Sequence, residues 1–124
     1  MTALLISIGA AIGAPSRFLL DQYLRKFIKY PYGILIINVL GSFVIGLTVL
    51  LPRGTVSYMP SGYITHTQAL VAVGFAGAFT TWSTFMLDLY LAFELKQYKS
   101  AATNLLLSLV LGLAAVWFGI HLVQ

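Results

Sequence analysis

The sequence predicts an all-α membrane protein with four transmembrane helices, the third of them broken at its middle. Of its 124 residues, 60% are hydrophobic and only 8% are charged, whereas a soluble domain carries about 25% charged residues. Charged side chains are absent from 1–16, 30–52, 54–87 and 100–124. Because about 20 mostly apolar residues span a bilayer, four spans fit, and a cluster of glycines and hydroxyl residues interrupts the third.

We expect the chain to form one transmembrane domain over 1–124, with no separate soluble part. The first segment lacks a basic leader and a small-residue cleavage site, and it contains Arg17, so we interpret it as a retained helix rather than a signal peptide. The predicted helices lie near 2–24, 32–52, 68–94 and 99–122.

Turn signals and basic residues separate these helices. Pro31 and Gly33 mark the first connection, Leu51-Pro52 ends the second helix, and 53–67 is polar and irregular. A short turn joins the last two helices. The first and third connections, which share one side of the membrane, carry Arg25, Lys26, Lys29, Lys96 and Lys99.

The opposite side carries Arg53 alone. The positive-inside rule therefore predicts that the first and third connections are cytoplasmic and that both termini lie outside.

The interruption of the third helix, 74–85, places two glycines and four hydroxyls where a membrane helix is usually most apolar. Irregular backbone at that depth is tolerated only where protein buries it or a water-filled cavity lines it. Broken membrane helices also present bare carbonyl and amide groups that can hold ions. The break therefore predicts an ion site. Its hydroxyls belong to Thr80, Thr81, Ser83 and Thr84.

Polar residues on the other helices fit either packing or a path. Arg17 can pair with Asp21 or snorkel to the interface, and it can also attract anions at a vestibule. Asn38 can hold helices together by hydrogen bonds. Asn104 and Ser108 stripe one face of the fourth helix, and Asp88, one turn after Thr84, is a membrane carboxylate with functional potential.

Aromatic spacing puts Phe75, Phe79, Trp82 and Phe85 along one side of the third helix. Such a stripe usually packs, yet the positive edge of a ring can also approach an anion.

Four short helices enclose little interior, so we expect an oligomer. Small residues four apart, such as Gly9 and Gly13, pack helices either between subunits or within one. The sequence has no cysteine, and we find no catalytic arrangement, metal-ligand cluster or phosphate loop. We therefore predict no enzyme. Because the excess of seven Lys and Arg over three acidic residues comes from the connections, we also expect no nucleic-acid partner.

Over essentially its full length the chain resembles the small four-helix fluoride channels known as Fluc or CrcB. The family's third-helix pattern is close to G-G-L-T-T-F-S-T-F-S-x-E, and 77–88 reads GAFTTWSTFMLD. The first-helix pattern G-x-x-x-R is met by Gly13 and Arg17, and a second-helix pattern, G-T-x-x-x-N-x-x-G, is approximated by 33–41. Three motifs in order on four spans are far more specific than any one of them.

The resemblance implies an antiparallel dimer in the cell membrane that passively exports fluoride through two pores and so lowers fluoride toxicity. It implies a structural Na⁺ at the dimer centre, held by the backbone carbonyls of Gly77 and Thr80. Arg17 and Asp88 would lie at vestibules. The residues that would line the fluoride pore are Asn38, Trp82, Ser83, Thr84, Phe85, Asn104 and Ser108.

Three departures from the family pattern concern the pore and the break. Trp82 replaces the usual first phenylalanine and brings an indole N–H, Ala78 and Phe79 replace a Gly-Leu pair, and Asn104 stands where some relatives carry tyrosine.

Two alternatives remain open at this point. Some relatives work as pairs of different subunits in opposite orientations. A chain that inserts both ways should have balanced basic flanks, so the charge bias and the altered pore residues fit such a partner, while a homodimer stays open. A proton-coupled multidrug exporter is also a four-helix antiparallel dimer, but it needs a deep acidic residue. The first helix offers only Asp21, near its end.

Overall fold

The computed structural model describes residues 1–28, 32–49 and 64–123. Within these ranges the chain is all-helical, and four helices are long and apolar enough to cross a membrane, which confirms the predicted fold class. Lys29, Pro31, the predicted helix end at 50–52 and Arg53 lie outside the described residues. The elements are α1 (Thr2–Leu24), α2 (Tyr32–Val49), η2 (Gln68–Ala76), α3 (Gly77–Phe79), α4 (Trp82–Glu94) and α5 (Tyr98–Leu122).

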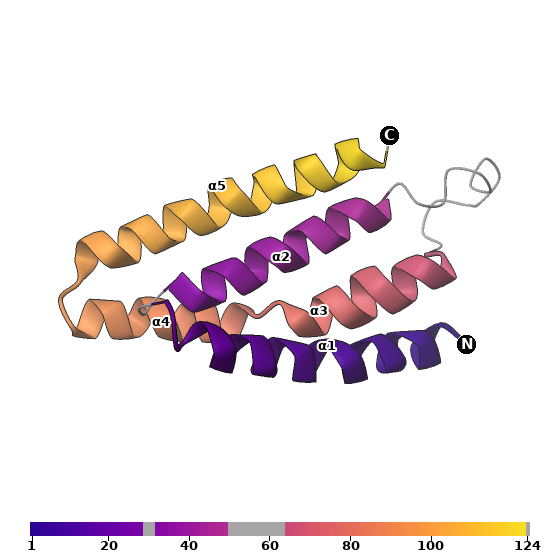
Figure 1. Cartoon of the computed structure of the whole chain (residues 1–124), viewed down its shortest axis with the longest axis horizontal. Coiled ribbons are helices and arrows are strands. Elements are labelled where there is room, and N and C mark those ends of the chain that lie inside the picture. The colour runs from indigo at the N-terminus through magenta and orange to yellow at the C-terminus, as the bar shows by residue number, and fades with distance from the viewer. Residues whose placement is uncertain (29–31, 50–63, 124) are drawn as a thin grey trace.

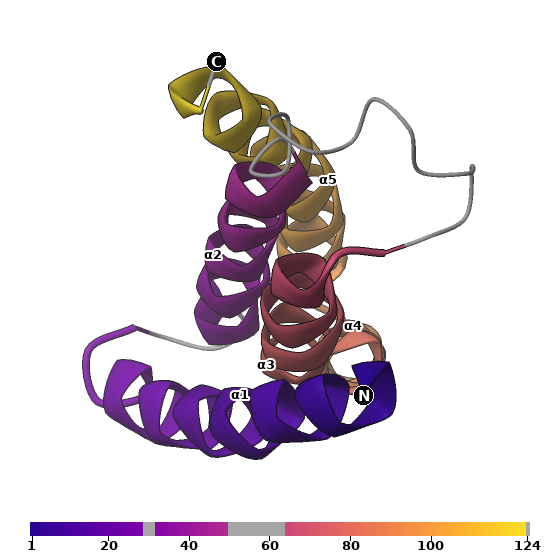
Figure 2. The ribbon, with the colours of Figure 1, turned by 90° about the vertical axis from the view of Figure 1, so that its right-hand side faces the viewer.

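The third span consists of η2, α3 and α4 in succession. Its first part, η2, is π-helical, so its hydrogen bonds run from residue i to i+5. Figure 1 shows the span interrupted between α3 and α4, with α1 on one side and α2 on the other. Seen end-on in Figure 2, α1 crosses beside the third span, whereas α2 and α5 lie together on the far side. Accordingly, α1 packs on η2 and α3, and α5 packs on α2 and α4.

Glycines close the contact between α1 and η2. A Cβ atom added at Gly9 would overlap backbone atoms of Leu70, Gly74 and Phe75, and one at Gly13 would overlap the Phe75 carbonyl. Side chains at these positions would push the helices apart, so backbone meets backbone directly. The pair Gly9 and Gly13 therefore packs helices within one subunit.

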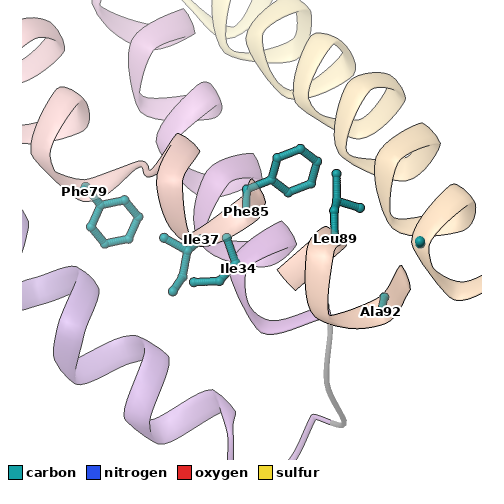
Figure 3. Close-up of a cluster of buried hydrophobic side chains, with 7 residues drawn as sticks. Ile34, Ile37, Phe79, Phe85, Leu89 and Ala92 are labelled. Carbon is teal, nitrogen blue, oxygen red and sulfur yellow. The ribbon is translucent and has the colours of Figure 1, made fainter. Parts of the chain in front are cut away.

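The buried apolar core lies beneath the break. Figure 3 shows Ile34 and Ile37 of α2 between Phe79, on one side of the break, and Phe85, on the other. Both isoleucines and both phenylalanines are buried. Because this core contacts both halves of the third span, it holds them in place although the helix between them is interrupted. Leu89, Ala92 and Ala101 complete the cluster.

A short turn connects α4 to α5. The Gln97 N–H donates to the Ala92 carbonyl and the Lys96 N–H donates to the Phe93 carbonyl, a pattern that satisfies the last carbonyls of α4. Lys96 adopts φ 56°, the left-handed conformation that glycine usually provides at this position. The sequence offers no glycine there, and α5 begins two residues later.

Candidate functional site

Two extended residues form the break. Thr80 has φ −80° and ψ 156°, and Thr81 has φ −147° and ψ 126°. The Thr81 hydroxyl accepts a hydrogen bond from the Thr84 N–H at 3.3 Å and so caps the N-terminus of α4, as threonine commonly does. The hydroxyls of Ser83 and Thr84 lie 3.3 Å and 3.2 Å from that of Thr81. The run of hydroxyls thus ends one helix and starts the next.

Asn38 of α2 replaces the hydrogen bonds that the break removes. Its Nδ2 donates to the Thr81 carbonyl at 3.2 Å, and its Oδ1 accepts from the Thr81 N–H at 3.0 Å. Both backbone groups of Thr81 are therefore satisfied at a depth where lipid offers no partner. This contact is the helix-bridging role that the sequence allowed for Asn38. A second hydrogen on Nδ2 remains for another acceptor.

The same contact releases a carbonyl on the other side of the break. In a continuous helix the Gly77 carbonyl would accept from the Thr81 N–H, but that N–H donates to Asn38. The Thr84 N–H, which would reach the Thr80 carbonyl, donates to the Thr81 hydroxyl instead. Within the described residues, no hydrogen bond ends on either carbonyl oxygen. Gly77 is also exposed, so these oxygens fit a hard cation such as Na⁺.

Two clefts open at the break, and they share two residues. The first, of about 250 Å³, is lined by Asn38, Ser42, Ile45, Thr80, Thr81 and Trp82. The second, of about 190 Å³, is lined by Asn38, Trp82, Phe85, Leu105, Ser108 and Leu109. Asn38 and Trp82 thus stand between a cleft against α2 and a cleft against α5.

The break divides the predicted aromatic stripe into two pairs. The rings of Phe75 and Phe79 stack at a centroid distance of 5.4 Å, whereas those of Trp82 and Phe85 are tilted by 50° at 5.8 Å. Phe79 and Phe85 are buried, but Trp82 is 71% exposed. The second pair lines one of the two clefts described above, and the first pair lines neither of them.

Polar atoms on α5 are buried without partners. Both polar atoms of the Asn104 side chain and the hydroxyl oxygen of Ser108 have no hydrogen-bond partner in the part of the chain that the structure describes. Asn104 is fully buried. An unpaired buried amide costs about 1–3 kcal/mol, so this face of α5 is polar at the expense of stability. Ser108 lines the second cleft, and Asn104 lies one helical turn away.

The charged residues lie apart from the clefts. Arg17 does not pair with Asp21, because the Asp21 carboxylate binds the Arg25 Nε at 2.9 Å instead. The Arg17 Nε is buried and has no partner among the described residues. Asp88 is buried and lines neither cleft.

The structure thus brings together Asn38, Trp82, Phe85 and Ser108, while Ser83 and Thr84 join the cap of α4. Sequence reasoning singled out Thr80 and Thr81 as hydroxyls of the break, but it did not assign Ser42, Ile45, Leu105 or Leu109 to the site. Leu105 and Leu109 belong to a helix that is apolar nearly all round, so periodicity could not distinguish a cleft wall from a lipid face. Ser42 could be found only by its place on the small-residue face of α2, and Ile45 carried no signal.

The fold and the site together define a small multi-pass helical membrane protein with a polar break in its third span. Residues 4–120 match the family described as "CrcB-like protein, Camphor Resistance (CrcB)". The chain belongs to this family.

Curated relatives named "Fluoride-specific ion channel FluC" align with most of the chain. The relative from Campylobacter lari is 37% identical over 121 residues, which cover 95% of this chain and 93% of the relative. The relative from Parabacteroides distasonis is 38% identical over 120 residues, or 95% and 89% of the two chains. A relative from Methylococcus capsulatus is 43% identical over 117 residues, which cover 92% of this chain but 49% of that protein.

Proposed function

We propose that this protein is a fluoride-selective ion channel that passively exports cytoplasmic fluoride. The observation that carries the proposal is the polar break, where Asn38, Trp82, Phe85 and Ser108 line one cleft. Membership of the CrcB-like family and the names of the curated relatives support it.

Small donors without a fixed positive charge suit a small, strongly hydrated anion. The second Nδ2 hydrogen of Asn38, the Ser108 hydroxyl and the edges of the two rings can replace water around fluoride. No lysine or arginine lines either cleft among the described residues. Binding is then favourable enough for entry and weak enough for release, as conduction requires. Asn104, Ser83 and Thr84 would extend this track beyond the cleft.

A second subunit would close the path. The clefts open on the surface of one subunit, and the Trp82 side chain is largely exposed there. We propose an antiparallel pair in the cell membrane, formed either by two copies or by this chain and a homologous subunit. Arg17 and Asp88 would act at vestibules, where the positive charge of Arg17, whose Nε has no partner among the described residues, would raise the local fluoride concentration.

A structural Na⁺ fits the break. The carbonyl oxygens of Gly77 and Thr80, which accept no helical hydrogen bond, would hold it. Its positive charge would offset the repulsion between carbonyl oxygens of the two subunits that face one another. If so, replacing Na⁺ with N-methyl-D-glucamine lowers the thermal stability of the purified pair and promotes dissociation, whereas replacing chloride with sulfate in the presence of Na⁺ does not. Equal melting curves with and without Na⁺ would refute this site.

Fluoride efflux from liposomes that contain only this purified chain tests the function. We expect rapid loss of fluoride, followed with a fluoride electrode, and no parallel loss of chloride. Absence of flux from folded protein, restored when a homologous subunit is added, would identify a heteromeric channel. Proton-driven uptake of a cationic dye without fluoride flux would instead identify an exporter.

A further inference from the structure

Trp82 is the side chain that stands between the two clefts. It lines both of them together with Asn38, but Asn38 is held by its two hydrogen bonds to Thr81. Trp82 is the first residue of α4 and lies near the middle of the span Gln68–Glu94. A solute that moves from the cleft against α2 to the cleft against α5 therefore passes the indole ring.

The indole N–H of Trp82 lacks an acceptor. Among the residues that the structure describes, no hydrogen bond involves its Nε1, although the hydroxyls of the break and Asn38 are close in sequence or space. Trp82 is 71% exposed on the subunit, so its N–H is open to whatever covers this face, and hydrocarbon offers no acceptor at this depth. The acceptor must come from the contents of the clefts or from a second subunit.

Phe85 packs beside the indole ring. Phe85 lies 5.8 Å away at a tilt of 50° and is only 4% exposed, so it forms a fixed wall against which the indole rests. Asn38 and Ser108 border the same cleft. An anion beside the indole would thus have amide and hydroxyl donors within the same lining.

We propose that the Nε1–H of Trp82 donates a hydrogen bond to fluoride as the ion moves between the two clefts, and that this donor contributes to selectivity. The inference rests on the proposed function. A full N–H dipole is a stronger donor than the edge of a phenyl ring, and hydrogen bonds to charged acceptors are the stronger ones. The advantage is greatest for the smallest and most basic halide. Trp82 is therefore a specificity-determining residue in this chain.

The two tryptophans of the sequence make the test direct. Trp117 on α5 is also exposed, at 61%, but it lines neither cleft. Purified protein labelled with ¹⁵N at the indole nitrogens gives two Nε1–H resonances, and Trp117→Phe assigns them. We expect fluoride to move the Trp82 resonance downfield in a saturable manner. Chloride at the same concentration should leave it in place, and the Trp117 resonance should respond to neither.

Transport measurements provide a second, independent readout. Trp82→Phe keeps an aromatic ring but removes the N–H, so we expect the apparent fluoride affinity to fall about tenfold, the equivalent of one hydrogen bond to an ion, and discrimination against chloride to narrow. Trp117→Phe is the matched control and should leave both quantities unchanged.

Each outcome decides the point. A Trp82 resonance that does not respond to fluoride, in protein that conducts fluoride, overturns the inference and leaves the proposed function intact. Unchanged affinity and selectivity in a folded Trp82→Phe variant would overturn it as well. A saturable shift in protein that passes no fluoride would support the binding contact and refute conduction by this chain alone.

Discussion

The contact between α1 and η2 differs from the contact between α4 and α5 in how each treats polar atoms. In the first, Gly9, Gly13 and Gly74 let backbones touch, and a single added carbon would collide with main-chain atoms. In the second, Asn104 and Ser108 keep buried polar atoms that have no partner among the described residues, beside an open cleft. One contact is closed by backbone against backbone, and the other is open and polar.

The difference shows where this small protein holds its structure and where it leaves room for a solute. The closed contact fixes the first half of the third span, and Asn38 attaches the break to α2. The second half can then present donors without having to hold the fold together. Substitutions in the closed contact should thus affect folding first, and those in the open contact should affect transport first.

Gly9→Ala should have the largest effect. The new methyl group would meet backbone atoms of Leu70, Gly74 and Phe75, none of which can rotate away. We expect a loss of about 3 kcal/mol or more from overpacking, seen as aggregation in size-exclusion chromatography and a lowered melting temperature.

Gly112→Ala is the matched control for that change. At Gly112 the same methyl group meets only the Ser42 hydroxyl, at 3.6 Å, and alanine favours a helix by about 1 kcal/mol. It should therefore be neutral or stabilising. If both variants lost stability equally, the closed contact would not be the reason.

Asn38→Ala should come next. It leaves the N–H and the carbonyl of Thr81 unsatisfied inside the membrane, which we expect to cost about 2–3 kcal/mol and to abolish fluoride flux. Thr48→Val is the control on the same helix, because the Thr48 hydroxyl donates only to the Ile45 carbonyl of its own helix. Full flux in the Asn38→Ala variant would show that the break keeps its conformation without the two hydrogen bonds from Asn38 to Thr81.

Asn104→Leu should raise the stability of the protein but slow its fluoride transport. Removing an amide without partners should raise the free energy of unfolding by about 1–2 kcal/mol, while the loss of polar surface beside the cleft should slow fluoride efflux. Thr103→Val, where an exposed hydroxyl donates to the Lys99 carbonyl, should alter neither. A destabilised Asn104→Leu variant with normal flux would argue that the amide serves packing alone.

Lys96→Gly should have the smallest effect. Glycine adopts φ 56° without strain, so we expect a gain of about 1 kcal/mol in thermal stability and unchanged fluoride flux. Lys99→Gly, which removes the same charge from the first turn of α5, should instead lose up to about 1 kcal/mol. Equal shifts in the two variants would mean that charge, not backbone conformation, is responsible.

Much of the fold follows from the sequence because the bilayer imposes strict rules. Long charge-free runs must be helices, and glycines with hydroxyls in the third run predict its interruption. The sequence did not reveal which arginine forms an ion pair with Asp21. Asp21 lies four residues from both Arg17 and Arg25, and spacing alone cannot choose between them, whereas the structure pairs it with Arg25.

The sequence predicted which residues belong to the candidate site better than it predicted how they are arranged in space. Asn38, Trp82, Phe85 and Ser108 were expected at one pore, and they line one cleft, although their action on fluoride stays a prediction. Asp88 and Arg17 were expected at vestibules. They line neither cleft, and their place at vestibules stays a prediction.

The sequence alone determined that this protein lies in a membrane, that it has four spans and that the third is broken, because each follows from local composition and from the absence of hydrogen-bond partners in lipid. Only the tertiary structure decided that Asn38 completes the break and that Trp82 stands between two clefts. Those facts depend on contacts between residues far apart in the sequence, such as Asn38 and Thr81, which are 43 positions apart. Such contacts are set by how helices pack rather than by any local pattern.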